Sequence, residues 1–212
     1  MKYLVISTCI LILSTTSILA QNPSPNLNLG VKGGLNISTV GGDDIEERDS
    51  RTSFNAGLFA EVPLTDRFSF QPEVLYSGQG FDIMEIDQDN IFDTNENIEY
   101  QLDYIQFPLM AKAYLIKGLY VEAGPQFGFK INEEIDTAPN SDGGDTPIDP
   151  DDSYVKDFDF SGALGAGYKF DGGFFLSARY THGFSSIFKD DTVFEDVDAR
   201  NSVWQFGVGF SF

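Results

Sequence analysis

The sequence predicts an all-β fold, an eight-stranded antiparallel up-and-down transmembrane β-barrel, and three observations lead to this prediction. Apolar and polar residues alternate in eight segments, the connections between these segments are short and long in turn, and the last segment ends on an aromatic residue. Strict alternation is what a strand needs when one side faces lipid and the other faces a barrel interior. Short turns at one end and long loops at the other are typical of outer-membrane barrels.

The predicted strands follow the alternation along the chain. They cover residues 27–38, 52–62, 67–80, 100–116, 119–131, 157–170, 173–187 and 201–212. Three connections are tight and rich in turn formers, at residues 63–66, 117–118 and 171–173. Four are long and acidic, at residues 39–51, 81–99, 132–156 and 188–199. An even number of strands places both chain ends on the side of the short turns.

The first twenty residues have the pattern of a secretory signal peptide. Lys2 precedes a mostly apolar run from Tyr3 to Leu13, and the stretch closes with small residues and Ala20. An uncleaved membrane anchor is the alternative, which the shortness of the apolar run disfavours. We therefore expect a signal peptide over residues 1–20 and an outer-membrane β-barrel domain over residues 21–212. The single cysteine, Cys9, lies in the signal, so the mature chain has no thiol.

Composition and charge limit the kinds of partner that the protein can bind. The formal net charge is −20 and the calculated isoelectric point is about 4.1, which makes nucleic acid an unsuitable partner. About 190 mature residues suffice for one domain. The secretion signal and the barrel pattern predict the outer membrane of a Gram-negative bacterium, with outer-membrane lipid around the barrel.

The last strand carries a pattern of its own. Its aromatic face ends the chain, as in a signal read by the barrel-insertion machinery during biogenesis, and consists of Trp204, Phe206, Phe210 and Phe212, with Val208 between them. The other residues of this strand are small or polar. We expect the aromatic side to meet lipid and the small side to face inward.

The other strands sort into two faces in the same way. One face is bulky and apolar, and the other mixes charges of both signs with glycines and polar residues, including Lys32, Glu61, Glu73, Lys112, Glu122 and Arg179. Eight strands enclose an interior that side chains largely fill. Buried charges need partners, so these six are predicted to form an interior ion-pair network. A proton or solute pathway along them is the alternative.

Two patterns suggest chemistry. The acidic stretch 140–152 offers carboxylates that could bind Ca²⁺, namely Asp142, Asp145, Asp149, Asp151 and Asp152, but their spacing is not that of an EF-hand, and a solvated acidic loop is the alternative. The only histidine, His182, lies near Ser185 and Ser186, where a hydrolase would need a nucleophile, a base and an orienting acid. A histidine in an interfacial belt is the simpler interpretation. No catalytic residue and no cofactor are assigned.

Several blocks resemble a known family. They are Gly30–Ser38, Gln71–Gly80, Tyr104–Leu109, Gly118–Gly128, Leu164–Tyr168 and Gln205–Phe210. Together they are similar to the strands of the outer-membrane β-barrel family that includes PorT, found mainly in Bacteroidota. The resemblance covers nearly all of the mature chain and implies a barrel in the outer membrane without a catalytic motif. Because PorT is associated with type IX secretion, it also makes an envelope or secretion-complex protein a candidate partner.

Three functional hypotheses remain open from the sequence. The first is a barrel with a structural, adhesive or secretion-accessory role and no catalysis. The second is a membrane-embedded hydrolase or a narrow conduit, which would use His182 or the inner charges. The third is a soluble periplasmic lipocalin-like barrel that binds an apolar ligand, with the two faces exchanged.

Overall fold

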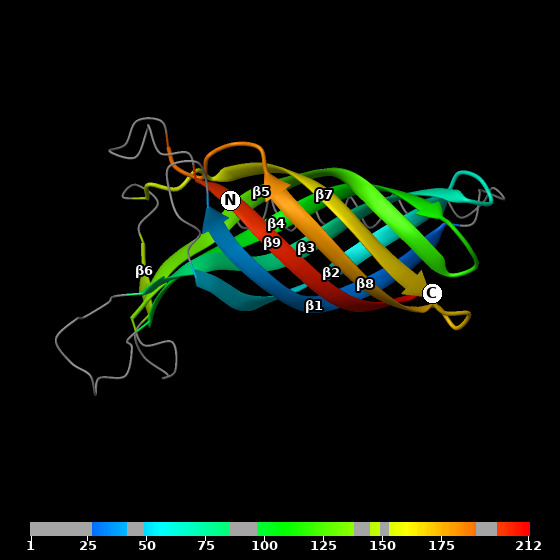
Figure 1. Ribbon diagram of the computed structural model, residues 1–212, viewed down its shortest axis with the longest axis horizontal. Coiled ribbons are helices and arrows are strands. Elements are labelled where there is room, and N and C mark those ends of the chain that lie inside the picture. The colour runs from blue at the N-terminus through cyan, green and yellow to red at the C-terminus, as the bar shows by residue number, and fades with distance from the viewer. Residues whose placement is uncertain (1–26, 42–48, 85–96, 138–144, 149–152, 190–198) are drawn as a thin grey trace, which may run out of the picture.

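The computed structural model describes residues 27–41, 49–84, 97–137, 145–148, 153–189 and 199–212 (Figure 1). The predicted signal peptide lies outside these residues. The residues that the structure describes form nine strands: β1 Asn28–Gly41, β2 Asp49–Pro63, β3 Phe68–Met84, β4 Asn97–Tyr114, β5 Leu119–Asp136, β6 Asp145–Pro147, β7 Phe158–Lys169, β8 Phe174–Gly183 and β9 Arg200–Ser211. Among the described residues there is no helix with the length and hydropathy of a membrane span.

Eight of these strands close into an antiparallel barrel. The order around the wall is β4-β3-β2-β1-β9-β8-β7-β5, and pairing of β4 with β5 closes the ring. The first and last strands of the chain are therefore neighbours, with β1 paired to β9 from Gly30–Ser211 to Gly41–Arg200. The strands run obliquely around one closed wall (Figure 1). The predicted eight-stranded barrel is confirmed.

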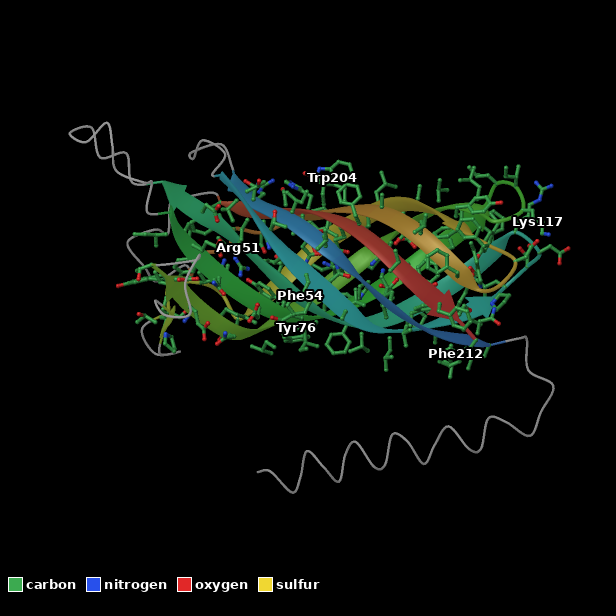
Figure 2. The ribbon with its side chains drawn as sticks, turned by 90° about the horizontal axis from the view of Figure 1, so that it is seen from below. Arg51, Phe54, Tyr76, Lys117, Trp204 and Phe212 are labelled. Carbon is green, nitrogen blue, oxygen red and sulfur yellow. The ribbon has the colours of Figure 1, made fainter. Side chains whose placement is uncertain are left out.

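The three short turns lie at one end of the barrel, which we call the turn end. Gly118 and Gly173 have positive φ values of 83° and 86°, which glycine adopts without the penalty that a side chain brings. Figure 2 shows Lys117 and Phe212 toward this end and Arg51 toward the opposite, loop end. Both described chain ends, Leu27 and Phe212, belong to the turn end, since the backbone N–H of Phe212 donates to the carbonyl oxygen of Leu29.

Five strands continue by three or more residues past their predicted ends on the loop side, with β1 reaching Gly41 and β2 beginning at Asp49. β3 reaches Met84, β4 begins at Asn97, and β5 reaches Asp136, where β6 pairs with it. We call residues 80–84, 97–103, 130–136 and 145–147 the loop-side extension. The predicted ends lay where the apolar alternation stops, but backbone pairing continues in β3, β4 and β5, where polar side chains follow.

The seventh predicted strand was too long. β8 ends at Gly183, and the chain after it leaves the wall. Ile187, placed by prediction at the strand's outer end, is instead buried. Its side chain packs into the barrel mouth with the buried apolar residues there.

The outer surface of the barrel is apolar on every strand. Exposed large apolar side chains include Leu29, Leu35, Phe54, Leu58, Phe70, Val74, Phe107, Val121, Phe129, Phe158, Leu164, Leu176, Trp204, Phe206 and Phe210. Phe54 contacts Tyr76, which lies beside it in Figure 2, with ring centroids 5.1 Å apart. The ring centroids of Tyr180 and Trp204 are 5.0 Å apart. A surface of this kind is stable in hydrocarbon and unfavourable in water.

Interior glycines make room for aromatic rings near the turn end. Phe59 and Phe175 meet edge to face at 5.4 Å. A Cβ atom on Gly209 would lie 2.3 Å from Phe175 Cζ and 2.6 Å from the carbonyl oxygen of Val31. A side chain at this position therefore has no space unless the ring and the neighbouring strand both shift.

Replacing Gly209 by alanine is expected to destabilise the barrel by about 1–3 kcal/mol, the usual range for overpacking. Urea-induced unfolding of the refolded barrel in lipid vesicles would measure the change. Gly172→Ala is the matched control, because nothing lies within 4 Å of its Cβ position. Equal effects of the two substitutions would contradict the packing argument.

Candidate functional site

The centre of the barrel interior holds a buried arginine between two carboxylates. Arg179 on β8 donates from Nη2 and Nη1 to the two carboxylate oxygens of Glu73 on β3, at 2.7 and 3.0 Å. Its Nε donates to Glu122 Oε1 on β5 at 2.8 Å. All three side chains are at most 2% exposed. Bidentate pairing of this kind is the strongest ion-pair geometry that arginine offers.

Two lysines complete this cluster. Lys32 Nζ on β1 lies 3.1 Å from Glu73 Oε2, and Lys112 Nζ on β4 lies 3.8 Å from Glu122 Oε2. Lys112 also sits over the Tyr120 ring, 4.1 Å from its centroid. We call Arg179, Glu73, Glu122, Lys32 and Lys112 the central ion-pair network. It connects five different strands across the lumen.

Glu61, the sixth predicted interior charge, lies nearer the turn end. Its carboxylate accepts from Ser69 Oγ at 2.8 Å, Tyr114 Oη at 2.6 Å and Lys169 Nζ at 3.0 Å. These residues form the inner side of a recess of about 450 Å³ that opens at the turn end. At the rim, Lys117 donates to Asp171 at 2.8 Å, and this hydrogen bond raises the pKa of the exposed Lys117.

An apolar cluster closes the loop end of the lumen. It packs Val40, Phe81, Leu102, Tyr104, Val155, Ile187 and Ala199, and we call it the apolar cap. Two segments outside the wall strands contribute to it, 153–157 and 186–189, which pair with each other through Val155 and Phe188. Lys130 fastens the first segment, because its Nζ donates to Ser153 Oγ at 2.8 Å and to the Val155 carbonyl at 2.9 Å.

Uncharged polar side chains lie between the cap and the network. Asn36 Nδ2 donates to Ser77 Oγ at 2.9 Å, and Asn55 Nδ2 donates to Asn36 Oδ1 at 2.6 Å. Asn201 donates to Gln79 across the lumen. The interior is thus filled in order by ion pairs, by amides and hydroxyls, and by apolar side chains.

The remaining predicted residues lie apart from this interior. His182 has intermediate exposure, and its Nδ1 is 2.9 Å from Ser202 Oγ, while its ring stacks with Tyr180. Ser185 is exposed. Trp204, Phe206, Phe210 and Phe212 are all exposed on the outer surface. The serine hydroxyl beside His182 is thus that of Ser202 on β9.

The predicted acidic loop is described only in part. Asp145 lies in β6, paired with Asp136 on β5. Asp142, Asp149, Asp151 and Asp152 lie outside the described residues. Within the described part of the chain, no group of three or more His, Cys, Asp or Glu side chains is placed to hold a metal ion.

Sequence patterns gave no sign of the apolar cap. Val155 and Ile187 lie in segments that were interpreted as a loop and as the end of a strand. The available signal was a pair of apolar residues flanking acidic stretches, which also fits a lipid-facing strand end. Only the three-dimensional path of these segments distinguishes the two.

The family is shown by sequence comparison. The outer membrane protein beta-barrel domain matches residues 19–189. The chain belongs to this family. The barrel therefore resides in the outer membrane, as predicted, and the soluble lipocalin-like alternative is wrong, because the apolar face lies outside and the charges inside. No curated protein matches the chain in sequence.

Solved structures of outer-membrane proteins are similar to this barrel, and one of them, Neisserial surface protein A, shares its fold. Neisserial surface protein A is similar with a TM-score of 0.57 and 13% identity, covering 88% of this chain and 99% of that chain. Ail, the attachment invasion locus protein of Yersinia pestis, is similar with a TM-score of 0.46 and 16% identity, covering 87% of this chain and 98% of that chain. OprG from Pseudomonas aeruginosa is similar with a TM-score of 0.41 and 13% identity, covering 89% of this chain and 97% of that chain.

Proposed function

We propose that this outer-membrane barrel is a non-conducting, non-catalytic anchor that presents its loop-side extension to a partner, in an adhesive or secretion-accessory role. The observation that carries the proposal is the filled interior. A solute crossing the lumen would have to displace the apolar cap and then separate the buried pairs of Arg179 with Glu73 and Glu122. Leaving such charges unpaired costs several kcal/mol, so a narrow conduit is the less favoured function.

The loop-side extension is the surface best suited to a partner. Its side chains are held by contacts with one another and with Arg51 of β2: Arg51 with Glu99 at 2.9 Å, Gln101 with Asp136 at 3.3 Å, and Asn132 with Asp103 at 3.3 Å. Fixed side chains lose less entropy on binding than mobile ones. Carboxylates outnumber cations among them, which favours a basic partner. A partner in an envelope or secretion complex, as the PorT resemblance suggests, fits this chemistry.

Conductance and crosslinking together test this function. We expect the purified barrel, folded as judged by heat-modifiable migration, to give no single-channel openings in planar lipid bilayers. In intact cells, a photoactivatable thiol crosslinker on Gln101→Cys should yield an adduct that is lost in high salt. The mature chain has no other thiol, so labelling is confined to this position.

Lys117→Cys provides the matched control, because it is exposed at the turn end. The same adduct from position 117, or none from 101, would argue against the loop-side extension as the binding surface. Steady openings from the folded barrel would overturn the non-conducting anchor and restore the conduit.

A further inference from the structure

The amide layer between the cap and the network contains oxygen atoms without hydrogen-bond donors. Gln106 Oε1, Gln126 Oε1 and Asn201 Oδ1 are buried and have no partner among the described residues. The three side chains are at most 5% exposed. An unsatisfied buried carbonyl oxygen costs about 1–3 kcal/mol. Three unsatisfied oxygens in one layer favour a bound metal cation, which accepts lone pairs from oxygen and offers none itself.

Strand register places the residues that carry these oxygens near one carboxylate. One row of paired residues runs Gln106–Gly128–Asp159 across β4, β5 and β7, and the next runs Gln126–Ser161–Gly183 across β5, β7 and β8, with Asn201 of β9 beside Gly183. Gly128 and Gly183 place no side chain between them. A Cβ atom on Gly183 would be 3.5 Å from Asp159 Oδ1 and 3.4 Å from Asn201 N. Asp159 therefore lies against Gly183, next to Asn201.

Asp159 differs from the other carboxylates of the lumen. Glu61, Glu73, Glu122 and Glu133 each have a lysine or arginine within 4 Å. Asp159 is 8% exposed and has no such cation in the described part of the chain. Lys130, on the same side of the lumen, is already held by Glu133 and Asp157. The Asp159 carboxylate thus has a hydrogen bond from Ser161 but no lysine or arginine of the described residues within 4 Å.

We propose that Asp159, together with the side-chain oxygens of Gln106, Gln126 and Asn201, binds a monovalent metal cation of the sodium class inside the barrel. Carboxylate and amide oxygens are hard ligands, suited to cations that bind oxygen. A single charge balances one carboxylate. A divalent ion would carry one charge more than the Asp159 carboxylate can balance.

Thermal unfolding in matched salts tests the site. Unfolding of the detergent-folded barrel is followed by loss of heat-modifiable migration, in sodium chloride and in choline chloride of the same ionic strength. A tenfold gain in the folding equilibrium constant from sodium is worth about 1.4 kcal/mol and should raise the midpoint by about 3–6 °C. Asp159→Asn should remove this difference, while Asp171→Asn, exposed at the turn end, should keep it.

A second measurement keeps the test decisive if Asp159→Asn does not fold. Wild-type crystals grown with thallium(I) should show an anomalous peak beside the Asp159 carboxylate. Equal midpoints of the wild type in the two salts, or a lumen that contains water molecules and no anomalous peak, would overturn the proposal.

Discussion

Replacing Arg179 by methionine is expected to cost the folded barrel about 3–5 kcal/mol, as for the loss of one partner from a buried ion pair. The substitution leaves Glu73 and Glu122 facing each other at the centre of the lumen with only Lys32 and Lys112 to balance them. Lys112 is 3.8 Å from Glu122, against 2.7 Å for Arg179. The cost arises from the two buried carboxylates rather than from the lost arginine contacts themselves.

Urea titration of the barrel in lipid vesicles would measure this loss. Adding Glu73→Gln and Glu122→Gln to Arg179→Met should not restore the stability, because Lys32 and Lys112 would then be buried without carboxylate partners. Arg51→Met is the matched control, since its pair with Glu99 is partly exposed and should be worth about 1 kcal/mol or less. An Arg179→Met barrel within 1 kcal/mol of the wild type would show that the network contributes little.

Alternation along single strands was enough to predict the barrel. It placed Arg179 and Glu73 on one face, but it could not pair them, because they lie 106 residues apart and on strands that are not neighbours in the wall. Contacts across the lumen depend on register and strand tilt, which a single sequence does not show. The sequence also shows which glycines lie on the inner face. It does not show which of them face the rings of Phe59 and Phe175, because that depends on the same register and tilt.

The loop end was the least predictable part. Val155 and Ile187 enter the lumen from segments whose composition is that of acidic loops. β6 is three residues long and ends in a proline, so it carries no alternation to recognise. Asp159 stood out only as one more charge on the inner face. Whether a cation lies beside it depends on contacts between strands, which alternation along one strand does not show.

Replacing Leu164 by arginine is expected to destabilise the barrel in a lipid bilayer by about 2–4 kcal/mol, the range for arginine near the bilayer midplane. Leu164 lies in β7, in the middle of an outward apolar run from Phe158 to Tyr168, and 66% of it is exposed. In water an exposed leucine can become arginine at almost no cost. A large loss of stability in the Leu164→Arg variant would therefore show that lipid surrounds this position, because packing within the protein does not explain it.

Leu64→Arg supplies a closely matched control. Leu64 is 65% exposed, but it lies in the turn between β2 and β3, beyond the apolar band. Refolding both variants in lipid vesicles and titrating with urea should leave Leu64→Arg close to the wild type while Leu164→Arg loses stability. Repeating the titration in a zwitterionic detergent micelle, which lets water approach the barrel wall more closely, should narrow the gap. Equal stabilities in vesicles would mean that the band at Leu164 is not in hydrocarbon. The two leucines have the same chemistry and exposure, so only their depth in the membrane separates the expected results.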